Sequence, residues 1–191
     1  MAGVRSSGLA EAAGGAAAVA AEWVEDFPEE AVRLAAVVPE EAGNMHTKDF
    51  VHLLDEKAIA SAIAEAEKRT SGEIRVFVSE REVQDAVKEA ENQFVALGMT
   101  KTAERNGVLI YFAPKSQKYA VIGDTGVHQR CGQDFWQHIT AKMTPLLKEG
   151  KFSEAVLLAI REIGEVLARE FPMKADDKNE LPNQIIREKQ E

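Results

Sequence analysis

Hydrophobic positions along the chain predict alternating helices and strands from about Asp55 onward. Apolar residues recur three and four positions apart between Asp55 and Ser71-Gly72, which is the spacing of an amphipathic helix. Residues 73–79 then alternate apolar and polar side chains, as a strand does. A second helical pattern covers residues 83–97 and is closed by Gly98. This part of the chain is therefore expected to fold as helix, strand, helix.

Continuous hydrophobicity marks the next element as a buried strand. Residues 108–113 are apolar without alternation, which is typical of a central strand covered on both faces. A polar turn at 114–118 separates them from residues 119–122, which we expect to pair back as a hairpin.

Two helices complete the pattern. One is predicted from about Gln129 to Met143, with Pro145 kinking or restarting it, and the other begins at a cap on Ser153. The resulting order of elements predicts an α/β fold, a three-layer α/β/α sandwich with a small mixed sheet.

Composition divides the 191-residue chain into three parts. Residues 1–44 contain 13 Ala and 5 Gly and carry −6 of the formal net charge of −9. Such a leader offers little apolar area to offset the entropy of ordering, so we expect it to be disordered. Two alternatives stay open: a secretory signal within it, and a true start at Met45 that makes the leader a gene-model artefact. Residues 45–172 are expected to form the domain and 173–191 a polar tail, in which Leu181, Pro182, Ile185 and Ile186 could dock.

Charge and composition exclude several classes of protein. The acidic balance disfavours a nucleic-acid binder and a protein held to anionic lipid by charge. A single cysteine, Cys131, excludes an intramolecular disulfide and a thiolate-rich metal site. No apolar run reaches the roughly 18–20 residues of a membrane span. We therefore expect no nucleic-acid partner, no membrane span and a cytoplasmic location, with any protein partner unknown.

Several common catalytic motifs are missing from the sequence. It contains no phosphate loop, no Gly-x-Ser-x-Gly elbow and no His-Glu-x-x-His or paired Cys-x-x-Cys. Cys131 and His128 suggest a nucleophilic pair, although a small buried thiol is the favoured interpretation of the cysteine. No catalytic residue is assigned on these grounds.

Asp124 is the strongest candidate metal ligand. It follows the hairpin strand in Gly123-Asp-Thr-Gly126, and ligands in α/β sheets bind outside the carboxyl ends of strands. With Asp134 and Glu73 it would supply oxygen ligands to a divalent cation, calcium rather than magnesium. The alternative is that the glycines form a tight turn, Asp124 caps the next helix, and the other two carboxylates are solvated.

Arg105 and Asn106 are candidate phosphate contacts. Arg105 offers a planar fork of donors for phosphate oxygens, and Asn106 stands directly before the buried strand. The alternatives are that Arg105 pairs with a neighbouring carboxylate or caps a helix and that Asn106-Gly107 is a backbone turn.

Two runs of residues resemble a known family. They are Phe94-x-x-Leu97-Gly98-Met99-x-Lys101-Thr102-x-x-Arg105-Asn106-Gly107-Val108, and Ile122-Gly123-Asp124-x-Gly126-Val127-His128 with Gly132-x-x-Phe135-Trp136. Together they resemble the TPM domain family, which includes a thylakoid-lumen photosystem II repair protein described as an acid phosphatase.

The resemblance covers about Asp55 to Pro172, and Asn179-Glu180-Leu181-Pro182 is similar to the tail of short bacterial members. It implies an α/β/α sandwich and a divalent-cation-binding module in repair or assembly, or alternatively a metal-assisted acid phosphatase acting on phosphomonoesters. Many members carry a signal peptide, a carboxyl-terminal membrane helix, and an aromatic residue where Asp124 stands, so this chain departs from their pattern.

Overall fold

The computed structural model describes residues 33–37, 47–173 and 184–188. Most of the leader, and Leu181 and Pro182 of the tail, lie outside these described residues. The expectations for those segments therefore stay predictions.

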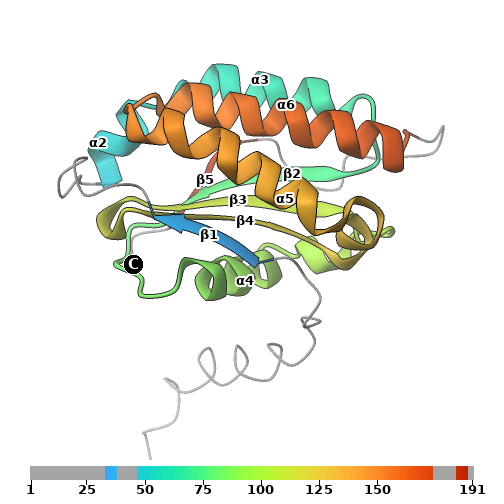
Figure 1. Ribbon diagram of the computed structural model, residues 1–191, viewed down its shortest axis with the longest axis horizontal. Helices are drawn as coiled ribbons and strands as arrows, with labels where there is room; N and C mark the ends of the chain where they lie inside the picture. Colours follow the sequence, from blue (N-terminus) through green and yellow to red (C-terminus); the bar gives the residue numbers. More distant parts are fainter. Residues whose placement is uncertain (1–32, 38–46, 174–183, 189–191) are drawn as a thin grey trace, which may run out of the picture.

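A five-stranded mixed sheet forms the middle layer, as Figure 1 shows. Its central pair is parallel, and the hairpin partner and the strand beyond it run antiparallel to their neighbours. A short last strand lies parallel to the other side of the central pair. In spatial order the strands are β1 (Arg33–Val37), β4 (Lys118–Gly123), β3 (Gly107–Ala113), β2 (Glu73–Val78) and β5 (Ile186–Arg187).

Helices cover both faces of this sheet, which confirms the three-layer α/β/α sandwich (Figure 1). Three long helices lie on one face and one helix lies on the other. The three are α3 (Glu56–Glu67), α5 (Thr125–Lys148) and α6 (Phe152–Glu170), the one is α4 (Ala86–Ala96), and α2 (Thr47–His52) precedes α3. Two 3₁₀ turns, η3 (Met99–Lys101) and η4 (Pro114–Ser116), flank β3.

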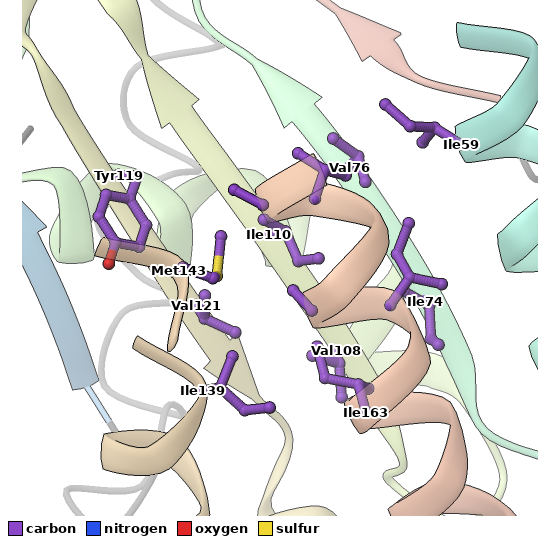
Figure 2. Packing of buried hydrophobic residues seen from close by; sticks show 14 of the residues in the cluster. Ile59, Ile74, Val76, Val108, Ile110, Tyr119, Val121, Ile139, Met143 and Ile163 are labelled. Carbon is purple, nitrogen blue, oxygen red and sulfur yellow. The ribbon is translucent and has the colours of Figure 1, made fainter. Parts of the chain in front are cut away.

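Alternation along β2 divides the core into two clusters. Ile74, Val76 and Val78 belong to the larger cluster, between the sheet and α3, α5 and α6, and Figure 2 shows the first two opposite α6. Phe77 belongs to the smaller cluster on the α4 face, where its ring stacks on Tyr111 with centroids 5.7 Å apart. Every residue of β2 and β3 is buried, as the continuous apolar pattern of β3 predicts.

The structure contains three elements that the sequence pattern did not predict. β1 lies inside the leader segment and pairs with β4 over five residues. The α2 helix and the two-residue strand β5 were not predicted either. Ile185 and Ile186 of the tail pack on the larger and smaller cluster respectively, so their expected docking is confirmed.

The boundaries of the last two helices also differ from the prediction. α5 begins at Thr125 rather than near Gln129, and its interruption is at Gly132 rather than Pro145. Gly132 adopts φ 71°, which a residue without a Cβ accepts readily, whereas Pro145 lies inside α5 without an interruption. Ser153 does not cap α6, whose cap position is Lys151. The Ser153 hydroxyl instead accepts from Asp55 N at 2.8 Å and donates to Leu53 O at 2.9 Å, and so holds the loop before α3.

Candidate functional site

The candidate site lies where β2 and β3 begin and β4 ends. Glu73 pairs with Gly107 across the parallel strands, and Val108 pairs with Gly123 across the antiparallel ones. Asp124 therefore follows the carboxyl end of β4 but lies at the amino ends of the central strands. This corrects the expectation of a crevice at the carboxyl ends, which holds only for strands that run in the same direction.

Asp124 caps α5 and forms an ion pair with Arg105. Its Oδ1 accepts from Thr125 N at 2.7 Å and from the Thr125 hydroxyl at 3.2 Å. Its Oδ2 accepts from Arg105 Nε at 2.8 Å. The capping interpretation is thus confirmed. The Asp124 side chain is 1% exposed and that of Arg105 is 41% exposed, so a buried anion is neutralised by a cation that reaches water.

The first turn of α5 holds the loop that carries Arg105. Gly126 N donates to Arg105 O at 3.0 Å, and Asp124 N donates to Gly107 O at 2.9 Å. A Cβ on Gly126 would lie 2.4 Å from Glu104 O and 2.7 Å from Arg105 O, so only glycine allows this approach. Arg105 itself has a φ of 51°, a costly conformation for a residue with a side chain. Strain of this kind persists only where the surroundings impose it.

Ser71 and Glu104 form a second polar pair, in addition to Arg105 and Asp124. The sequence did not predict this second pair. The Ser71 hydroxyl donates to Glu104 Oε2 at 2.6 Å and accepts from Asn106 Nδ2 at 3.1 Å. Asn106 is 1% exposed, and its Oδ1 accepts no hydrogen bond in the part of the chain that the structure describes. Their positions in the sequence could have predicted this contact, because Ser71 and Glu104 each stand just before the first residue of one of two adjacent parallel strands.

The other two predicted metal ligands lie in different surroundings. Glu73 is buried at the start of β2, with its Oε2 3.9 Å from Arg75 Nη2. Burial lowers the pKa of the Arg75 guanidinium, and the carboxylates of Glu73 and Glu67 oppose that shift. Asp134 is exposed on α5, beyond the interruption at Gly132.

A preassembled carboxylate site is not found here. Within residues 33–37, 47–173 and 184–188, no group of three or more His, Cys, Asp and Glu side chains is placed to hold a metal ion. The Glu104 and Arg105 carbonyl oxygens lie close to Gly126, and both oxygens of the Asp124 carboxylate accept from Thr125 or Arg105.

Cys131 has the environment of a small buried thiol. It is partly buried against the larger core cluster. Burial, with a contribution from the charge of Glu170, raises the pKa of the thiol to about 11. A thiol with such a pKa is a poor nucleophile at neutral pH.

An α/β/α sandwich with an Arg-Asn-Gly entry to its central strand and a Gly-Asp-x-Gly helix cap defines the class of this protein. The chain belongs to the TPM domain family, whose model matches residues 47–166. Among solved structures, it is similar to the NMR structure of BA42 protein from the psychrophilic bacterium Bizionia argentinensis sp. nov.. The two are 39% identical with a TM-score of 0.65, and the match covers 70% of this chain and 92% of that one.

No curated protein matches the sequence. No helix in the described ranges is long and apolar enough to cross a membrane.

Proposed function

We propose that this TPM domain is a divalent-cation-binding module with a role in repair or assembly, and that it prefers calcium to magnesium. The observation that supports the proposal is the difference in solvent exposure between the two partners of the Asp124–Arg105 ion pair. Asp124 is a buried carboxylate, and its partner Arg105 is a side chain that reaches solvent. A cation would replace the Arg105 charge and leave the buried carboxylate neutralised.

The donor set favours calcium among the common divalent cations. Calcium accepts carboxylate, amide and backbone oxygens in flexible geometry, whereas magnesium requires a nearly ideal octahedron. Asp124 offers a carboxylate from the cap of α5, and the loop before β3 offers the amide Oδ1 of Asn106 and the Glu104 and Arg105 carbonyls. Since few charges contribute, we expect weak binding, on the order of 10⁻⁴ to 10⁻³ M.

Isothermal titration with CaCl₂ and MgCl₂ tests this proposal on the full chain. Asp124→Asn should abolish calcium binding while keeping the helix cap, because an amide oxygen still accepts from Thr125 N. Arg105→Gln should tighten calcium binding, because it removes the competing cation. Asp134→Asn is the matched control, since it removes a carboxylate from the same helix at an exposed position.

The outcomes separate the alternatives. Equal calcium affinity in wild type and Asp124→Asn, or no binding in either, would reject this site. A loss in Asp134→Asn as large as that in Asp124→Asn would restore the wider set of carboxylates predicted from the sequence.

A second candidate function is metal-assisted hydrolysis of phosphomonoesters. It is supported by the short hydrogen bond from the Ser71 hydroxyl to Glu104, next to the candidate phosphate contacts Arg105 and Asn106. Release of inorganic phosphate from p-nitrophenyl phosphate, measured from acidic to neutral pH with and without calcium or magnesium, tests it.

The cytoplasm is the proposed location of the protein. The partly buried free thiol of Cys131 is compatible with a reducing compartment. Fractionation of cells that express the tagged full chain tests this location.

A further inference from the structure

We propose that Ser71 is a phosphoryl-accepting nucleophile, with Glu104 as its general base and Arg105 as the group that binds the transferred phosphoryl oxygens. The inference deepens the second candidate function and rests on it. It also supplies a nucleophile, which that function needs and which the sequence motifs do not reveal.

The first support is the hydrogen-bond geometry of Ser71. A serine hydroxyl is a weak nucleophile unless an adjacent base takes its proton. The Ser71 hydroxyl donates to Glu104 Oε2 at 2.6 Å, within the range expected of a nucleophile and its base. Asn106 Nδ2 donates to Ser71 Oγ at 3.1 Å and so fixes the orientation of the hydroxyl. This amide would also stabilise negative charge as it develops on Oγ.

The second support is that Arg105 stands between Glu104 and Asn106 along the chain, so its guanidinium belongs to the same loop. Its Nε is bonded to Asp124, which fixes the plane of the guanidinium. A phosphate would contact the terminal Nη groups, in the forked arrangement that suits two phosphate oxygens. Ser71, Glu104 and Arg105 are all partly exposed, so a substrate can reach them from solvent.

The third support comes from the other end of the Asn106 amide. Its Oδ1 is a buried acceptor to which no described residue donates, and unsatisfied polar groups of this kind are rare away from functional sites. Its presence beside Ser71 favours a loop that is organised around a ligand. The strained φ of Arg105 and the close contact with Gly126 hold the whole loop in place for that ligand.

The reaction has two displacements at phosphorus. In the first, Ser71 Oγ bonds to phosphorus, its proton passes to Glu104, and the bond from phosphorus to the ester oxygen breaks. Glu104 then gives that proton to the leaving alkoxide, which departs as an alcohol. In the second, a solvent water attacks the phosphoserine, its proton passes to Glu104, and Ser71 Oγ leaves and recovers the proton. The balance is one ester and one water giving one alcohol and one inorganic phosphate.

Trapping the phosphoserine tests this inference directly. The full chain is incubated with p-nitrophenyl phosphate and quenched in acid, in which phosphoserine is stable, and the phosphorylated peptide is identified by mass spectrometry. We expect a phosphoryl group on Ser71 in wild type and none in Ser71→Ala. Glu104→Gln keeps the hydrogen bond but cannot take the proton, so phosphoserine formation should fall by about 100-fold or more.

Ser116→Ala is the matched control. That serine lies in η4, at the opposite end of β3, where its hydroxyl accepts from Val83 N at 2.6 Å. It should keep full labelling and turnover. Thermal melts and circular dichroism of each variant show whether it is folded, and a variant with native melting but no labelling supports a chemical role.

Three results would overturn the inference: no phosphoserine in wild type during measurable turnover, equal turnover in wild type and Ser71→Ala, or no turnover by wild type at all. Only the last of these also rejects the second candidate function.

Discussion

Arg105 Nε lies 2.8 Å from Asp124 Oδ2 and joins the loop before β3 to the cap of α5. The two partners differ in what their loss would leave behind. Without Arg105, a buried carboxylate would lose its countercharge. Without the charge on Asp124, the half-exposed guanidinium of Arg105 could turn to water. The stability of the site therefore depends on which partner is changed.

We predict that Arg105→Gln destabilises the protein by about 1–3 kcal/mol, the cost of leaving a buried polar group unsatisfied. Asp124→Asn should cost about 1 kcal/mol or less, because it keeps the cap and leaves a solvent-accessible guanidinium. The double variant should be more stable than Arg105→Gln alone. Urea denaturation of the four proteins measures this coupling, and strictly additive losses would contradict it.

Gly126→Ala should destabilise the protein by about 1–3 kcal/mol, as is typical of overpacking. The added methyl meets two backbone carbonyls, which cannot move aside as a flexible side chain can. Gly132→Ala is the control: nothing lies within 4 Å of its Cβ, so it pays only the strain of a positive φ. Hydrogen exchange should show loosened amides at residues 105–107 in the first variant and protected ones in the second.

Glu188→Ala should cost about 1–3 kcal/mol, because its carboxylate is the partner of several groups at the edge of β2. It accepts from the Ser79 hydroxyl at 3.1 Å and from Glu80 N at 3.0 Å, and it pairs with Arg81. Among the described residues, Arg187→Ala breaks the solvent-exposed ion pair with Glu56, which is worth less than about 1 kcal/mol. Equal losses in the two variants would show that the tail strand is held by other contacts.

Cys131 should react slowly with iodoacetamide in the folded chain, since burial raises the pKa of its thiol to about 11. The neutral thiol is the form that the fold favours. Its stabilising contribution is complete below the ordinary thiol pKa near 9 and is lost as pH rises through 11. Alkylation rates against pH, in buffer and in urea, measure both values. An apparent pKa near 9 in buffer would contradict the prediction.

Deleting residues 1–44 should lower the melting temperature by more than about 4 °C, roughly 1 kcal/mol for a domain of this size. The deletion removes β1 and leaves the outer edge of β4 without a partner strand, which favours self-association. Deleting residues 1–32 alone keeps β1 and is the matched control. Equal melting of the two shortened chains would show that β1 adds nothing to stability.

Sequence patterns predicted the elements that bury a regular face and missed those that depend on a distant partner. β2 alternates and β3 is continuously apolar, and both lie where expected. β1 reads Arg-Leu-Ala-Ala-Val within an alanine-rich segment, so its composition hides it. β5 has two residues, too few for any period, and its place is set by pairing with Phe77 and Val78.

The same division applies to the candidate site. Arg105, Asn106 and Asp124 were identified because glycines and a buried strand flank them. Ser71 was missed because its contact with Glu104 depends on the parallel register that sets Glu73 opposite Gly107. The spacing of residues along the chain does not predict that register.

The interruption at Gly132 divides α5 into two segments that pack against different parts of the protein. The first part carries the Asp124 cap and rests on the end of α6, where Arg130 stacks on the Phe171 ring at 4.1 Å and bonds to Glu170 O. The second part carries Trp136 and Met143 into the core. The short segment before Gly132 therefore links the Arg105 loop to the end of α6, and Trp136, whose ring lies where a Cβ on Gly123 would be, is placed to report a shift of the Asp124 cap through its fluorescence.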